Sequence, residues 1–228
     1  MKKLFDNIKD IFKKQSKELE ELSMDLNEKL KIFIEAYLKK NKVERSPFLI
    51  VGIRNEEGLK EDVINDFLGY LDEELFLVKG TTDPSVYWTT SKERNKKGTF
   101  HLKTGYHKRI WCVGIHKGYE AFVNNWKYCL PTEGWRDSDY NFEYNNKDVL
   151  VKDYFGINFH RMHPLKIVDR IGKYSGGCQV VNDNKDLQHI LKRFKSKNLY
   201  KKNKYATVDY MLFDLNELPK DIQKELYA

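Results

Sequence analysis

A glycine-rich turn that ends in a cysteine is the stretch of this sequence best suited to covalent chemistry. It reads Ser-Gly-Gly-Cys over residues 175–178 and is followed, one residue later, by a pair of β-branched valines. Glycines let the backbone bend sharply, and we expect the N–H groups of Gly177 and Cys178 to face a developing oxyanion. Ser175 is expected to hold the local backbone or to orient an imidazole. The turn therefore predicts a nucleophilic thiol at Cys178.

A base for this thiol is available eighteen positions upstream. His160 ends the alternating stretch 154–160, which predicts a strand. A free thiol is mostly protonated at neutral pH, so a nucleophilic cysteine needs a base or a cation beside its sulfur. We expect His160 to be that base and to lower the pKa of the Cys178 thiol.

Zinc binding is the alternative chemistry for the same residues. His160, His163 and Cys178 are all of zinc-ligand type, and the two histidines lie three positions apart. That spacing suits a helix, whereas Pro164 and the preceding strand pattern oppose one. No fourth ligand is evident, so we expect no metal and no other cofactor.

The other two cysteines are expected to be structural. Cys112 and Cys129 lie in apolar stretches, where cysteine behaves as a small hydrophobic residue. Three cysteines are too few and too uneven for a disulfide framework, although a bridge between these two stays open.

The first 45 residues form a separate segment. They contain no glycine or proline, and their apolar residues recur at intervals of three and four. This pattern predicts an amphipathic helix over residues 1–45 that ends before Pro47. The helix is expected to pack on its own domain or to mediate self-association; a basic helix lying on an anionic membrane is the alternative.

Residues 46–228 change to short apolar or alternating runs separated by Gly, Asn, Asp and charged clusters. Such runs predict a mainly β domain, a sandwich or a barrel, with short C-terminal helices. The strands are expected at 48–54, 62–71, 75–80, 98–103, 109–116, 119–130, 154–160 and 206–215, and the helices at 184–194 and from Pro219 onward.

The net charge of +7 favours a polyanionic partner such as a cell-wall polymer, nucleic acid or an acidic membrane face. Residues 192–205 carry seven basic and no acidic side chains, but they match no nucleic-acid motif, so nucleic acid is not expected. No apolar run reaches the roughly 18 residues of a membrane span. Asp6 and Asp10 interrupt the N-terminus, which does not resemble a signal peptide. We expect synthesis in a cytoplasm and action elsewhere only after release.

The stretches FGINFH and IGKYSGGCQV together resemble the active-site signature of L,D-transpeptidase-like proteins, in which a histidine on a strand precedes a Ser-x-Gly-Cys turn. GTTDPS, GYHKRIWCVGIHKGYEAFV, WRDSD and FGINFHR are more closely similar to a variant found in phage-encoded and prophage-encoded lysins. The resemblance covers residues from about 48 to 215.

This resemblance implies a mainly β catalytic fold that acts on peptidoglycan stem peptides. Cys178 would be the nucleophile and His160 the general base, while Ser175 and Gly177 would support the site. Many family members have an arginine two places after the cysteine, where this chain has Val180. The candidates to bind substrate instead are Arg161, Lys173, Arg109 and His116.

The predicted function is a peptidoglycan stem-peptide hydrolase of the endolysin type, phage-encoded and acting at the cell wall through a thioester on Cys178. The alternatives are an L,D-transpeptidase that cross-links stem peptides and a non-enzymatic basic phage or assembly protein that binds a polyanion.

Overall fold

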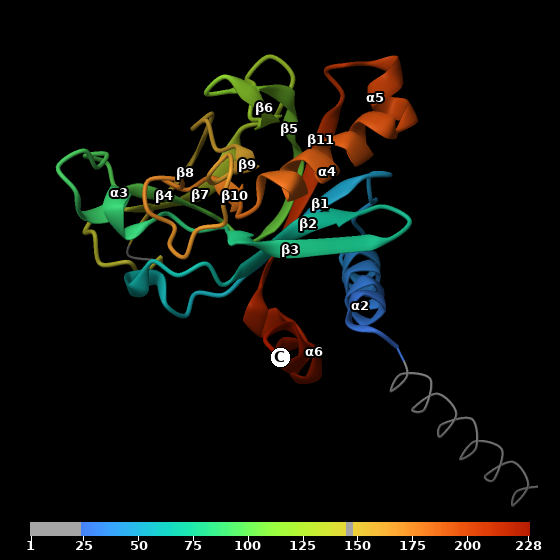
Figure 1. The fold of residues 1–228 in the computed structure, drawn as a ribbon, viewed down its shortest axis with the longest axis horizontal. Coiled ribbons are helices and arrows are strands. Elements are labelled where there is room, and N and C mark those ends of the chain that lie inside the picture. The colour runs from blue at the N-terminus through green and yellow to red at the C-terminus, as the bar shows by residue number, and fades with distance from the viewer. Residues whose placement is uncertain (1–23, 145–147) are drawn as a thin grey trace, which may run out of the picture. The chain divides into compact units, whose positions relative to one another are not determined.

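The computed structural model describes residues 24–144 and 148–228, which form two units (Figure 1). The larger unit is Arg45–Leu218, and the smaller unit combines the N-terminal residues up to Glu44 with Pro219–Ala228. A boundary near residue 45 was expected. The C-terminal ten residues group with the N-terminal segment, although the sequence analysis assigned them to the larger domain.

The described part of the smaller unit contains two helices, α2 (Leu26–Lys40) and α6 (Lys220–Leu226). Asp25 caps α2 by accepting a hydrogen bond from the Glu28 N–H at 2.9 Å. One face of α2 is buried at a spacing of four residues, through Leu30, Ile34 and Leu38. The predicted amphipathic helix is confirmed over Leu26–Lys40, while residues 1–23 of that prediction lie outside the described part of the chain.

The larger unit is built on a closed eight-stranded barrel, so the prediction of a mainly β fold is confirmed. Strands β1 and β11 pair in parallel, as do β9 and β10, and the other neighbours are antiparallel. Around the barrel the strands are β1 (Leu49–Arg54), β11 (Thr207–Asp214), β5 (Gly105–His116), β6 (Tyr119–Val123), β9 (Phe159–Arg161), β10 (Gln179–Val181), β3 (Leu75–Thr81) and β2 (Asp66–Leu71).

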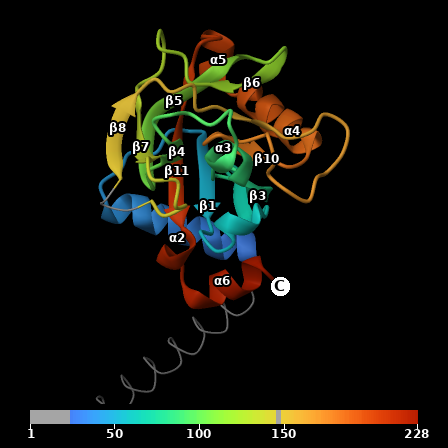
Figure 2. The ribbon, with the colours of Figure 1, turned by 90° about the vertical axis from the view of Figure 1, so that its left-hand side faces the viewer.

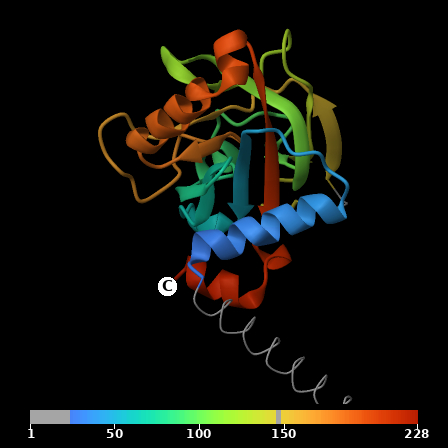
Figure 3. The same ribbon diagram turned by 90° about the vertical axis from the view of Figure 1, so that its right-hand side faces the viewer.

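A second, three-stranded sheet lies beside the barrel in the same unit (Figure 2). Its order is β4 (Thr99–Leu102), β7 (Thr132–Asp137) and β8 (Val149–Asp153). The unit also contains helices α3 (Val86–Thr90), α4 (Asn184–Ser196) and α5 (Asn198–Lys202), with 3-10 turns at Leu59–Glu61 and Leu215–Glu217. Helix α4, in orange in Figure 3, contacts β6, β9 and β10.

Aromatic side chains fill much of the core of this unit. Phe194 of α4 is fully buried, and its ring centroid lies 5.3 Å from Phe48, 5.5 Å from Phe122 and 5.5 Å from Tyr200. Trp111 is also fully buried and donates its indole N–H to the Ile157 carbonyl at 2.7 Å. Trp111 and Phe122 also pack against Phe159 of β9, with ring centroids 5.7 Å and 5.9 Å away, so this packing holds the strand that carries His160.

Several segments differ from the expected pattern. Residues 124–130 form turns, because the Asn124 amide donates to the carbonyls of Ile110 at 2.7 Å and Leu130 at 3.0 Å and folds the segment back. Residues 154–158 are irregular, and Gly156 adopts a φ of 69°. The basic stretch 192–205 is mostly helical, whereas the short strands β7, β8 and β10 were not predicted.

We predict that Phe194→Ala destabilises the protein by about 3–5 kcal/mol, because it leaves a cavity among the aromatic rings of the core. Urea denaturation followed by circular dichroism measures the effect. Leu165→Ala is the control, since Leu165 is 90% exposed, and it should change stability by less than about 0.5 kcal/mol. Equal stability of the two variants would contradict the assigned core.

Candidate active site

The turn before Cys178 has a shape that only glycine allows at position 177. Gly177 has a φ of 119°, and a Cβ placed on it would lie 2.1 Å from the Phe100 carbonyl oxygen. Backbone at this φ is strained for any other residue. The glycine therefore lets the cysteine turn sit directly against β4.

Ser175 holds this turn together. Its buried hydroxyl donates to the Cys178 carbonyl at 2.8 Å and accepts from the Gly177 N–H at 3.2 Å. Of its two expected roles, Ser175 therefore holds the backbone. The expectation that the Gly177 N–H faces an oxyanion is wrong, because that N–H is bound to Ser175. The Cys178 N–H has no acceptor among the described residues and remains suited to the role.

Cys178 and His160 come from neighbouring strands. Cys178 directly precedes β10, which runs parallel to β9 with Val180 opposite His160. Residues two apart on a strand share a face, so extending the β10 register by one residue puts Cys178 on the same face as His160. Tyr119 lies near both groups: its hydroxyl is 3.3 Å from His160 Nδ1, and burial together with the nearby Cys178 thiol raises its pKa. The fold therefore brings the two candidate catalytic groups to one place.

The Cys178 sulfur is crowded by protein. The Asn158 N–H donates to Sγ at 3.5 Å, and the thiol lies 3.8 Å from the Gly156 carbonyl oxygen. Burial raises the pKa of the thiol, which the Asn158 N–H and the Lys117 charge offset only in part. No histidine nitrogen hydrogen-bonds to the sulfur in the described part of the chain. The expectation of a lowered thiol pKa is therefore wrong, and the thiol is protonated at neutral pH.

His160 is held as a neutral base. Its Nδ1 lies 2.8 Å from the Arg161 carbonyl oxygen. A carbonyl can only accept, so Nδ1 carries the proton and Nε2 carries the lone pair. Burial lowers the pKa of the imidazole to about 3, and the nearby charges of Lys117 and Arg161 act in the same direction. The ring is therefore neutral near pH 7, with Nε2 free to take up a proton.

His116 lies against the proposed base. The two imidazole rings stack with their centroids 4.4 Å apart. The Asn158 amide donates to His116 Nδ1 at 3.0 Å, which puts the His116 proton on Nε2. That Nε2 is buried and has no hydrogen-bond partner among the described residues. Arg161 lies at the edge of the same group, with its guanidinium 4.0 Å from the Tyr119 ring centroid.

Two other predicted substrate-binding residues lie elsewhere. Arg109 is seven residues along β5 from His116, a distance of about 23 Å in an extended strand. Its guanidinium donates to the Tyr128 carbonyl at 2.8 Å. Lys173 is exposed in the loop before the cysteine turn, where its ammonium lies 3.9 Å from a Glu93 carboxylate oxygen.

Zinc ligation by His160, His163 and Cys178 has no geometric support. Within the described ranges, the one group of three potential metal ligands close enough to share an ion is Asp137, Asp139 and Asp148. His163 instead accepts backbone N–H bonds from Leu165 at 3.1 Å and Lys166 at 3.2 Å.

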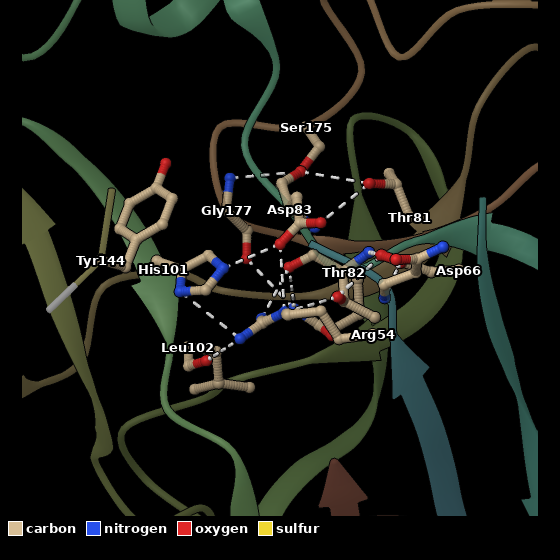
Figure 4. Close-up of polar contacts among 12 residues, drawn as sticks. Arg54, Asp66, Thr81, Thr82, Asp83, His101, Leu102, Tyr144, Ser175 and Gly177 are labelled. Atoms are coloured by element: carbon tan, nitrogen blue, oxygen red, sulfur yellow. Dashed lines mark hydrogen bonds and ion pairs between the residues drawn. The ribbon is translucent and has the colours of Figure 1, made fainter. Parts of the chain in front are cut away.

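A buried polar network centred on Arg54 lies beside the cysteine turn and was not predicted (Figure 4). The guanidinium donates to Thr82 Oγ1 at 2.8 Å, the Thr82 carbonyl at 3.0 Å and the Leu102 carbonyl at 2.7 Å. Its Nε lies 3.0 Å from Asp83 Oδ1, which also accepts from His101 Nε2 at 2.8 Å. A basic residue closing an otherwise apolar strand was the one sequence signal for it.

The network carries little net charge. Burial raises the pKa of both Asp66 and Asp83 above that of a free aspartic acid. Burial, together with the Arg54 charge, lowers the pKa of His101. Near neutral pH the two carboxyls therefore share less than two negative charges, which the Arg54 guanidinium balances.

Gln179 connects this network to the cysteine. Its Nε2 donates to the Thr82 carbonyl at 3.2 Å and to the Gly177 carbonyl at 3.3 Å. Its Oε1 accepts from the Tyr210 hydroxyl at 2.7 Å. The residue after Cys178 is therefore fixed by both the network and the barrel core.

Comparisons of the chain with protein-family models, curated proteins and solved structures find no significant match. No helix among the described residues is both long and apolar enough to cross a membrane.

We predict that Arg54→Met destabilises the protein by about 3–5 kcal/mol, because removing one partner leaves buried charge and carbonyl groups unpaired. Chemical denaturation measures the loss. Arg170→Met is the matched control, because Arg170 is exposed, and it should stay within about 0.5 kcal/mol of the parent protein. An Arg54 variant as stable as that control would show that the network is dispensable.

We also predict the pH dependence of Cys178 alkylation. The thiol pKa is raised above the usual 9.0, so the rate with iodoacetamide should rise with a midpoint above pH 9. His160→Ala should leave that midpoint almost unchanged, because a neutral imidazole does not stabilise the thiolate. Peptide mapping by mass spectrometry assigns the site, and the buried Cys112 should react far more slowly. A midpoint near neutrality that His160→Ala raises would instead indicate a thiolate–imidazolium pair.

Proposed function

We propose that the protein is a cysteine-dependent hydrolase of peptidoglycan stem peptides that works through an acyl-thioester on Cys178. The observation that carries the proposal is the position of Cys178 one residue before β10, whose register with β9 pairs Val180 with His160, together with the His160 proton held on Nδ1. The resemblance to L,D-transpeptidase-like lysins supplies the substrate class. The barrel would then be a version of that family's catalytic fold.

The first half of the proposed reaction forms the thioester. As Sγ attacks the peptide carbonyl carbon, His160 Nε2 takes the thiol proton. The Cys178 N–H donates to the carbonyl oxygen as it becomes negative. When the C–N bond breaks, the imidazolium returns the proton to the departing amine. The neutral resting pair suits this general-base step, since the proton moves only when the bond forms.

In the second half, water attacks the thioester carbonyl carbon. His160 Nε2 takes a proton from the water and delivers it to the departing sulfur, which restores the thiol. An amine acceptor in place of water would give L,D-transpeptidation, the alternative outcome. The net charge of +7 suits an anionic wall, where we propose that the protein acts after release, as phage lysins do.

Polyanion binding without catalysis is a second candidate function. A groove of about 460 Å³ is lined by cationic and aromatic side chains, including Arg109, Lys127, Tyr128 and Tyr205. The two tyrosine rings stack with centroids 4.3 Å apart, and no acidic residue lines the groove. Binding of a wall polymer by a variant without the Cys178 thiol would separate this property from hydrolysis.

We predict that the protein releases new peptide fragments from purified peptidoglycan, identified by mass spectrometry. Fragments that gain water indicate hydrolysis, whereas fragments joined to an amine indicate transpeptidation. His160→Ala should lower the rate by several orders of magnitude as the general base is lost, while His163→Ala should change it little. A chelator should leave the rate unchanged. Dependence on zinc, or a fully active His160→Ala variant, would overturn the mechanism.

A further inference from the structure

A small cavity adjoins the cysteine turn and is lined by Arg136, an arginine of the WRDSD stretch to which the sequence assigned no role. Its volume is about 160 Å³, and its walls include Trp88, Phe100, Arg136, Phe155, Ile157 and Gly176. That volume equals about five water molecules at roughly 30 Å³ each, enough for a carboxylate group and a small side chain.

Two residues that line the cavity, Gly176 and Ile157, are close in the chain to Cys178 or to a residue that contacts its sulfur. Gly176 is two residues before Cys178 in the turn, and Ile157 precedes Asn158, whose N–H contacts the Cys178 sulfur at 3.5 Å. Two residues of the cavity wall are therefore close in the chain to the groups that surround Sγ.

Arg136 brings a positive charge to this cavity, and no carboxylate of the described residues forms an ion pair with it. It lies on β7, and its guanidinium carbon is 5.4 Å from the Phe100 ring centroid and 4.8 Å from that of Phe155. One guanidinium nitrogen donates to the Gly98 carbonyl at 2.9 Å. No carboxylate pairs with it within the described ranges, and residues 145–147 are Asn-Asn-Lys. Burial lowers its pKa, but it stays charged.

A half-buried guanidinium with unused donors favours an anionic ligand of matching shape. Arginine binds carboxylates through two parallel N–H···O bonds, and these bonds are stronger where water is partly excluded. The aromatic walls supply such exclusion and hold the guanidinium plane in place. The cavity thus combines a fixed fork of donors with room for one small residue.

We propose that Arg136 binds a free carboxylate of the substrate, so that the site selects peptides with an ionised carboxylate close to the reacting carbonyl. The position of this carboxylate relative to the cleaved bond rests on the proposed function; carboxylate binding itself does not. Arg136 would then fill the substrate-binding role for which Arg161, Lys173 and Arg109 are the candidates from the sequence. Of these, Lys173 pairs with Glu93, and Arg109 donates to the Tyr128 carbonyl far along β5 from His116.

The test compares two ligands that differ only in charge. The full-length Cys178→Ala protein is titrated calorimetrically with N-acetyl-D-alanyl-D-alanine and with its C-terminal amide. The free carboxylate should bind roughly ten- to hundredfold more tightly, the range expected for hydrogen bonds between charged groups. Adding Arg136→Gln should abolish this preference, and Arg136→Lys should retain part of it because the charge remains without the fork.

Arg170→Gln is the matched control and should keep the full preference, since Arg170 is exposed. Thermal unfolding of each variant verifies that it is folded, and the Lys variant serves if the Gln variant is not. Equal binding of the two ligands, no binding of either, or an unchanged preference in Arg136→Gln would each overturn the proposal. Arg136-dependent binding in a protein that cleaves no peptidoglycan would leave this inference standing and refute the proposed hydrolase.

Discussion

The buried guanidinium of Arg54 ties together the chain segments that frame the cysteine turn. It ends β1, donates to the chain just after β3, and reaches the carbonyl of Leu102 at the end of β4. The Thr82 carbonyl that it binds also accepts from Gln179, the residue after Cys178. A buried charge is tolerated only when its donors are satisfied, so these segments must keep their positions for the charge to stay paired. The left-handed turn at Gly177 depends on the same frame, because it sits against the Phe100 carbonyl of β4.

Burial determines the charge states of the two candidate catalytic groups. Burial keeps the Cys178 thiol and the His160 imidazole neutral, each for the reason that the charged form loses hydration. In the proposed reaction, the sulfur and the imidazole would therefore become charged only as Sγ attacks the substrate and its proton moves to His160 Nε2. The cationic groups near the site, including Arg161 and Arg136, are suited to hold an anionic substrate rather than to ionise the thiol in advance.

Local pattern predicted the elements that follow simple periodicity. The apolar runs that became β1, β3, β5 and β11, and the capped helix α4, were placed within a few residues. Cys178 and His160 were chosen as candidates from residue type and from a family resemblance. The Arg54 network could not be found that way, because Arg54, Asp83 and His101 are separated by up to 47 positions and meet only when the strands close. Arg136 was given no role from the sequence for the same reason. Only the folded structure shows that no carboxylate of the described residues pairs with its guanidinium.

The most direct test of the central claim is the turnover of Cys178→Ala on solubilised peptidoglycan fragments, measured beside Cys112→Ala. Both variants should fold. Cys112→Ala should keep near-normal turnover, whereas Cys178→Ala should lose several orders of magnitude, as removal of a covalent nucleophile generally does. Retention of full turnover by a folded Cys178→Ala protein would contradict the claim that this thiol carries the reaction.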